Sequence, residues 1–247
     1  MRMAQSEVQI RPAATVMLLR DTADGLEVFM LRRHAAMAFA AGMYVFPGGR
    51  VDDADGAGDE GFVVAAIREC YEEAGILLAV DSEGGMVSDG HPALAHRIGV
   101  HDGTVDVRAL VAEHGLRLAT DQLPWVAHWI TPKGEATRRF DTRFYMVSSP
   151  TGQTSHHDDT ETVASMWVRP SDAVADHAAG NLQLMPPTIW CLRELARFTT
   201  ADEAMAWGRS IGAPDCVLPK LVYNTEGEFA GLVFPWDSTY ASIADPY

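Results

Sequence analysis

The segment RECYEEAGI, residues 68–76, decides how the rest of this 247-residue sequence is interpreted. Side chains three and four positions apart share one face of a helix, so Glu69, Glu72 and Glu73 are expected to gather within one turn. Three like charges so close together repel each other, and a hard divalent cation such as Mg²⁺ or Mn²⁺ turns that repulsion into coordination. An isolated ExxEE pattern is usually only a solvated acidic face. The choice between a solvated face and a metal site therefore depends on the residues that flank this segment.

The flanking residues predict a strand, a loop and a helix. MYVF at 43–46 forms a short predicted strand that stops at Pro47-Gly48-Gly49, and an acidic, glycine-rich loop follows. A helix is predicted from about Phe62 to Ala74, because Gly75 stands where a left-handed residue usually ends a helix. The stripe opposite the glutamates is apolar and is expected to bury against a sheet; it consists of Val63, Ile67, Cys70 and Ala74.

This strand, loop and helix resemble the Nudix hydrolase family, whose box reads G-x5-E-x7-R-E-U-x-E-E-x-G-U, where U is a bulky apolar residue. RECYEEAGI matches the second half of the box, with Cys70 as an apolar substitute, and Glu60 stands eight residues before Arg68. The first half departs from the pattern, because Ala54 occupies the place of the box glycine and the Pro-Gly-Gly lies five residues further upstream. We interpret this as a five-residue loop insertion, which leaves the role of Glu60 open.

The resemblance implies a role for each matching residue. Glu69, Glu72, Glu73 and the backbone carbonyl of Gly49 would bind Mg²⁺ or Mn²⁺, and Arg68 would hold the carboxylates through charge-assisted hydrogen bonds. The implied reaction is hydrolysis of a diphosphate bridge by a metal-activated water. The general base would be a box glutamate, with Glu69 and Glu72 as catalytic candidates, or an acid on a later loop.

The loop HHDDTE at 156–161 is the candidate for this later acid. One interpretation is a solvated connection between two strands. The other brings Glu161, Asp158 or Asp159 near the metals as an additional ligand or general base. Of these three residues, we expect Glu161 to be the catalytic one, because it stands at the mouth of a predicted strand.

The charge of the chain narrows the classes of partner. Nineteen Lys and Arg against 34 Asp and Glu give a net charge of −15, which excludes nucleic-acid binding through a broad basic face. A phosphate-bearing small molecule can still bind where cations gather locally. The candidate substrate-binding residues flank predicted strands; they are Arg33, Arg50, Arg139 and Arg143.

The sequence predicts neither a membrane span nor a secretory signal, because no apolar run of about 18 residues and no apolar h-region stand out in it. Its three cysteines are widely spaced, which fits a reducing compartment better than a disulfide framework. We therefore expect a cytoplasmic protein. Members of the family are often dimers, so a homodimer is one expected assembly.

The predicted fold is an α/β/α sandwich around a mixed β-sheet. We expect a single domain over residues 10–247, with a partly helical, lid-like insertion at 79–125 and a C-terminal extension at 200–247. Late in the chain, the pattern predicts helices near 171–179 and 186–208 and a hairpin that turns at 224–227. The predicted strands lie at 14–20, 27–33, 43–46, 126–130, 143–149 and 162–168.

The expected substrate comes from a wider resemblance. The strings VFPGGRVDDAD, WITPKGEATRRFDTRFYMV and LMPPTIWCLRELA are similar to the branch of the family that contains a mammalian peroxisomal coenzyme A diphosphatase. This resemblance implies coenzyme A or an acyl derivative as the substrate. ADP-ribose, NADH or a nucleotide sugar is the alternative. A nucleotide-sensing module without catalysis is less favoured, because such modules typically lose box glutamates that this sequence retains.

Overall fold

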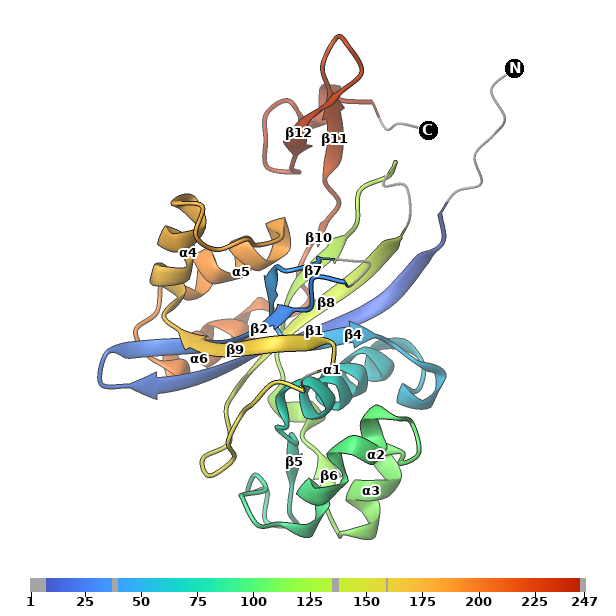
Figure 1. The fold of residues 1–247 in the computed structure, drawn as a ribbon, viewed down its shortest axis with the longest axis vertical. Coiled ribbons are helices and arrows are strands. Elements are labelled where there is room, and N and C mark those ends of the chain that lie inside the picture. Colours follow the sequence, from blue (N-terminus) through green and yellow to red (C-terminus); the bar gives the residue numbers. More distant parts are fainter. Residues whose placement is uncertain (1–7, 37–39, 135–137, 159, 245–247) are drawn as a thin grey trace.

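The central strand of the fold is β1 (Ile10–Thr22). The computed structural model describes residues 8–36, 40–134, 138–158 and 160–244 (Figure 1). Successive β1 side chains point to opposite faces of the sheet, as a period of two requires. Met17 and Leu19 therefore enter one core, and Val16 and Leu18 enter the other.

A mixed sheet is built around β1, which confirms the predicted fold class. Within the described residues its strands run in the order β10–β7–β8–β1–β2–β3, with β4 also paired to β1 and β9 to β2. The pairs β1–β8 and β7–β10 are parallel, and the other pairs are antiparallel. The strands are β2 (Gly25–Arg33), β3 (Tyr44–Val45), β4 (Gly48–Arg50), β7 (Trp125–Ile130), β8 (Arg139–Ser148), β9 (Thr162–Val168) and β10 (Cys216–Val217).

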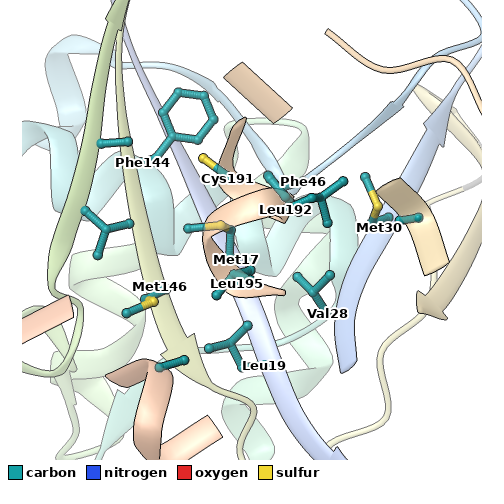
Figure 2. Packing of buried hydrophobic residues seen from close by; sticks show 14 of the residues in the cluster. Met17, Leu19, Val28, Met30, Phe46, Phe144, Met146, Cys191, Leu192 and Leu195 are labelled. Atoms are coloured by element: carbon teal, nitrogen blue, oxygen red, sulfur yellow. The ribbon is translucent and has the colours of Figure 1, made fainter. Parts of the chain in front are cut away.

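Helices cover both faces of the sheet (Figure 1). Helix α1 (Gly58–Ala74) buries Ile67 and Cys70 against one face, on the stripe that the sequence predicts. The other face is covered by α4 (Pro170–Ala178), α5 (Pro186–Leu195) and α6 (Ala201–Ile211). Figure 2 shows Leu192 and Leu195 of α5 in one apolar cluster with Met17 and Leu19 of β1 and Met30 of β2. Two apolar layers thus share the sheet between them.

The helical pattern predicted over 186–208 is two helices in the structure. The two helices are separated by a short break, and Thr200 caps the start of α6. The Thr200 hydroxyl accepts a hydrogen bond from the Glu203 N–H at 3.3 Å, and the Glu203 carboxylate accepts one from the Thr200 N–H at 3.3 Å. This reciprocal capping box specifies a new helix start. The apolar periodicity continues across the break, which is why periodicity alone predicted one helix.

Most of residues 79–125 pack on the side of α1 that faces away from the sheet, although Ala119 and Leu123 join the cluster between α1 and the sheet, and Trp125 begins β7. The segment contains α2 (Arg97–His101), α3 (Val107–Glu113), the paired strands β5 (Ala79–Val80) and β6 (Arg117–Leu118), and 3-10 turns at Pro92–His96 and Thr120–Gln122. Leu110 of α3 shares a third core cluster with Tyr71 of α1. The Tyr71 hydroxyl also donates to the Ala93 carbonyl at 2.8 Å. Helix α1 is therefore buried on two sides, and a lid role for the segment remains a prediction.

The chain ends in an antiparallel ribbon of β11 (Lys220–Tyr223) and β12 (Phe229–Val233), followed by a 3-10 turn at Tyr240–Ser242. Its turn lies where the sequence predicts it, with the Gly227 N–H donating to the Asn224 carbonyl at 3.0 Å. Gly227 has a positive φ of 83°, which favours glycine. In Figure 1 the ribbon projects beyond the end of the main sheet.

Candidate active site

A cleft with a volume of about 1150 Å³ extends from the glutamates and arginines that the sequence predicts as site residues to the C-terminal ribbon. At one end it is lined by charged side chains from three places in the chain: Glu69 and Arg68 on α1, Arg33 on β2, and Glu161 just before β9. The backbone of Gly49 on β4 lies with them. These residues lie far apart in sequence. The fold therefore brings most of the predicted site together.

Arg68 is the centre of the charged cluster. Its Nη1 donates to Glu69 Oε1 and to Glu72 Oε1, each at 3.0 Å. On its other side, Nε and Nη2 donate to the two carboxylate oxygens of Asp55 at 2.8 and 2.9 Å. Burial lowers the pKa of Arg68, but the hydrogen bonds to Asp55 and the charges of the glutamates outweigh burial and raise it overall. Arg68 is thus a permanent cation that orients Glu69 and Glu72.

Sequence reasoning missed Asp55. It lies in the inserted loop, in a 3-10 turn at Asp53–Asp55, and only 1% of it is exposed. Its Oδ2 also accepts the Asp52 N–H at 2.8 Å, which ties the turn to the guanidinium of Arg68. The available signal was the acidic run VDDAD between the glycines and the helix, because a buried arginine requires a carboxylate partner.

Glu60 takes no part in this cluster. Its side chain is 66% exposed and forms an ion pair with Arg108 Nη1 at 2.9 Å. Arg108 Nη2 in turn donates to the Asp55 carbonyl at 2.5 Å, so α3 helps to hold the inserted loop. The insertion therefore leaves Glu60 outside the cleft, while Asp55 contacts Arg68.

Glu73 holds the glycine loop. It is 3% exposed, and its Oε2 accepts the Gly48 N–H at 2.9 Å, while its Oε1 lies 4.0 Å from Arg33 Nη1. A Cβ added to the next residue, Gly49, would overlap the carboxylate of Glu69. The Pro-Gly-Gly turn thus lets the backbone of β4 approach the carboxylates of α1 closely.

The pKa values of Glu69, Glu72 and Glu73 are all raised, although Arg68 and Arg33 lie beside them. The pKa of Glu69 is raised to about 7. Burial is the largest cause and outweighs the lowering effect of Arg68, and the charges of Glu72 and Glu161 also contribute to the rise. Burial also raises the pKa of Glu72 and, together with the charge of Glu69, that of Glu73. Buried carboxylates that repel each other are a suitable environment for a cation.

The donor set fits a hard divalent cation. Among the described residues no three His, Cys, Asp or Glu side chains are already arranged as metal ligands. Arg68 takes Oε1 of Glu69 and of Glu72, which leaves Oε2 of each carboxylate for another partner. These oxygens, with the Gly49 backbone beside them, are the oxygen ligands that Mg²⁺ and Mn²⁺ prefer.

Glu161 completes the charged end of the cleft. Its side chain is 46% exposed, and its Oε2 lies 3.4 Å from Arg33 Nη2. Its charge contributes to raising the pKa of Glu69 and of Glu73, so it acts on the same cluster. Asp158 instead shapes the loop, because its Oδ1 accepts the N–H groups of three following residues, Thr160, Glu161 and Thr162. Asp159 lies outside the described residues.

The structure does not place Arg139 and Arg143 in the cleft. Arg139 is 3% exposed and its Nε donates to the Thr131 carbonyl at 3.1 Å. The Arg143 guanidinium stacks on Phe62 and Trp125, with 4.0 and 4.3 Å to the ring centroids. Its Nη1 pairs with Asp59 at 2.7 Å.

The period of β8 explains this arrangement. Phe140, Thr142 and Phe144 line the cleft, and the alternate residues Arg139 and Arg143 therefore point to the other face. The predicted Arg33 and Arg50 do line the cleft, together with Arg11 and Arg138. The cations that face the cleft are thus drawn from several strand ends.

His101 is a second cleft residue that the sequence did not single out. It comes from α2 in the 79–125 segment, and its Nδ1 lies 4.0 Å from Glu72 Oε2. No pattern around it in the sequence separates it from an ordinary surface histidine. Of the described residues in that segment, it is the one that lines the cleft.

Comparison with known proteins assigns the family. A family model described as the NUDT19 Nudix domain matches residues 57–197, and a NUDIX domain model matches residues 9–93. The chain belongs to the Nudix hydrolase family. This Nudix hydrolase is 26% identical to the human acyl-coenzyme A diphosphatase NUDT19, over 90% of this chain and 74% of the human protein. Its identity to the Xenopus laevis protein of that name is 22%, over 96% of this chain and 77% of the relative.

The fold of the Nudix hydrolase matches that of a solved relative. A crystal structure of a NUDIX hydrolase from Alicyclobacillus acidocaldarius superposes with a TM-score of 0.72 and 28% identity. The match covers 81% of this chain and 96% of that chain. In the part of this chain that the structure describes, no helix is both long and apolar enough to cross a membrane.

Proposed function

We propose that this Nudix hydrolase cleaves the diphosphate bridge of coenzyme A and of acyl-coenzyme A, and that the reaction requires Mg²⁺ or Mn²⁺. The observation that supports this most is the group of carboxylates, Glu69, Glu72 and Glu161, beside Arg33 at the end of one cleft. Relatives that align over most of the chain are named acyl-coenzyme A diphosphatases. This supports the choice of substrate.

The residues that would hold the cation are Glu69, Glu72, the Gly49 carbonyl and the Oε1 of Glu73. When bound, the cation lowers the pKa of the attacking water and neutralises charge on the transferring phosphoryl group. The contribution of Arg68 is to keep Glu69 and Glu72 in one orientation, because its Nη1 contacts both. A fixed orientation reduces the reorganisation needed during the reaction.

Arginines and Glu161 carry out the rest of the proposed reaction. Arg11, Arg33 and Arg50 line the cleft and would bind the diphosphate oxygens that the net charge of the protein otherwise repels. Glu161 would accept the proton of the attacking water. It is more exposed than Glu69 and is not held by Arg68. Arg33 contacts its Oε2, which leaves Oε1 for proton transfer.

A panel of candidate substrates tests the function. Coenzyme A, acyl-coenzyme A, ADP-ribose, NADH and a nucleotide sugar are incubated with Mg²⁺ or Mn²⁺, and the products are identified by mass. We expect 3′,5′-ADP together with 4′-phosphopantetheine or its acyl form, and no product in EDTA. Preferential cleavage of ADP-ribose, NADH or the nucleotide sugar would overturn the choice of substrate.

Glu73→Gln tests the metal site in the same assay. Glutamine keeps an oxygen for the Gly48 N–H, so the glycine loop is expected to stay in place, but it removes the charge next to Glu69. We expect kcat to fall much further than the melting temperature. Full activity in this variant would contradict the assignment of the helix carboxylates.

A further inference from the structure

Away from the carboxylates, the cleft is lined mainly by apolar side chains, together with Arg138, Thr131, Thr142 and Thr188. Trp129 of β7 and Phe140 and Phe144 of β8 form its floor. Met185, Pro186 and Pro187, at the start of α5, form one side. A further wall comes from the C-terminal ribbon and the residue before it: Pro219, Leu221, Tyr223, Phe229 and Leu232. No charged side chain of the described ribbon residues lines the cleft.

One face of the ribbon forms this wall. Leu221 pairs directly with Leu232, and Tyr223 pairs with Phe229. A register shift between Val222 and Tyr223 lets Phe229 and Leu232, three residues apart on β12, both line the cleft. Directly opposed residues of an antiparallel pair lie on the same face, and so do residues two apart on one strand. The four side chains, which we call the ribbon face, therefore share a single apolar surface that points into the cleft.

The other face of the ribbon is held by the C-terminal segment. Lys220 Nζ donates to the carbonyls of Tyr240 and Ile243 at 3.3 and 2.8 Å, and the Tyr240 hydroxyl donates to the Leu218 carbonyl at 2.6 Å. At the end of β12, Phe234 packs edge-on against Trp129, with 6.0 Å between ring centroids. These contacts fix the orientation of a two-stranded ribbon that would be marginally stable alone.

The ribbon face is only partly covered by the protein. Leu221 is 9% exposed, whereas Tyr223 and Phe229 are 48% and 62% exposed and meet edge-on at 6.4 Å between centroids. Contiguous apolar surface beside a charged site marks a place for an apolar ligand group. The ribbon also lies outside residues 57–197, which match the NUDT19 Nudix domain.

We propose that the ribbon face is the subsite for the acyl chain of an acyl-coenzyme A whose diphosphate lies at the carboxylates. This inference rests on the proposed function. One continuous cleft passes from carboxylates and arginines to aliphatic and aromatic side chains, and an acyl-coenzyme A has the same order of a charged diphosphate and an aliphatic chain. Free coenzyme A lacks the group that would cover Tyr223 and Phe229. The ribbon face therefore selects acylated over free coenzyme A.

The experiment compares acyl chains of increasing length. The full-length protein is assayed for kcat/KM on coenzyme A and on its acetyl, octanoyl and lauroyl thioesters. Each methylene that leaves water contributes about 0.8 kcal/mol, or roughly fourfold, so kcat/KM should rise with chain length. Tyr223→Ser/Phe229→Ser should lose at least about tenfold on lauroyl-coenzyme A and less than about twofold on coenzyme A.

A matched control places the same type of change on the opposite face. Val222→Ser lies between Leu221 and Tyr223 on β11 but does not line the cleft, so its chain-length dependence should match that of the unchanged protein. Equal losses on coenzyme A and lauroyl-coenzyme A in the double variant would overturn the proposal. So would a wild-type kcat/KM that does not change with chain length.

A binding measurement tests the acyl-chain subsite independently of the proposed function. Calorimetric titration in EDTA measures the affinities for coenzyme A and lauroyl-coenzyme A without turnover. Tighter binding of the lauroyl form that is lost in the double variant supports the subsite, even if the panel of substrates shows that another diphosphate is cleaved. Equal affinities for the two ligands overturn it, even if coenzyme A is hydrolysed.

Discussion

At the scale of single residues, the first prediction concerns Asp55, which connects the inserted loop to Arg68. Asp55→Asn keeps the volume of the side chain but removes the charge that receives two hydrogen bonds from Arg68. Outer partners of metal-site residues typically contribute about 10- to 100-fold to metal affinity or activity. We expect a loss of that size in kcat, with a higher Mg²⁺ requirement. Assays across a Mg²⁺ titration measure both.

Glu60→Gln is the control for this prediction. It removes a carboxylate that stands nearby in sequence but pairs with Arg108 in an exposed position. Exposed ion pairs contribute less than about 1 kcal/mol, so activity should stay close to that of the unchanged protein. Equal effects of Asp55→Asn and Glu60→Gln would show that the orientation of Arg68 does not limit the reaction.

Glu161 carries the second residue-scale prediction. Glu161→Gln should reduce kcat at least about tenfold, which corresponds to roughly 1.4 kcal/mol of barrier, with metal affinity little changed. Asp158→Asn should be milder, because the asparagine oxygen can still accept the loop N–H groups. If Glu161→Gln keeps a normal kcat while Glu69→Gln is inactive with metal bound, the general base lies on α1.

At the scale of elements, the 79–125 segment can be tested as core or as lid. Leu110 of α3 is 3% exposed in the cluster that covers Tyr71. Leu110→Ala should lower the free energy of unfolding by about 2–5 kcal/mol and leave kcat/KM of the folded protein unchanged. His101→Ala should change KM by less than about fivefold and leave stability unchanged, because its contact with Glu72 is long. Chemical denaturation and steady-state kinetics separate the two effects.

The opposite pattern would favour a lid. If Leu110→Ala leaves the unfolding midpoint unchanged but alters substrate preference, α3 does not belong to a core layer. The structure favours the core, because Tyr71 and Leu77 would lose their apolar neighbours without the segment.

The same elements show how much the sequence could predict. Helix α1 and the β1–β2 hairpin were predictable because periodicity and turn residues act locally. The orientation of Arg143 was also accessible, since Phe144 and Thr142 beside it are on the alternate face of β8. His101 was not predictable, because it meets Glu72 only after the chain folds, whereas the acidic run VDDAD offered a signal for Asp55 that sequence reasoning missed. Long-range contacts leave no local pattern in a single sequence.

At the scale of the molecule, the reactivity of the cysteines tests whether both layers of the sandwich are closely packed. Cys70 lies in the α1 layer and Cys191 in the α5 layer, and both are buried, whereas Cys216 on β10 is exposed. Burial raises the pKa of the Cys70 and Cys191 thiols and also blocks access to them. We expect a thiol reagent to modify Cys216 alone in the native protein. Cys216→Ser should abolish this fast reaction, and fast modification of all three thiols would contradict the layered packing.

Denaturant then tests whether the two layers unfold together. Strand β1 supplies Met17 to the α5 layer and Val16 to the α1 layer, so neither layer can lose its packing without disturbing the strand that supports the other. Such sharing favours one cooperative transition. In the Cys216→Ser protein, Cys70 and Cys191 should become reactive over the same range of denaturant, measured by pulsed labelling and mass spectrometry. If Cys191 reacts at a lower concentration than Cys70, the α5 layer opens separately, and β1 does not couple the two faces of the sheet.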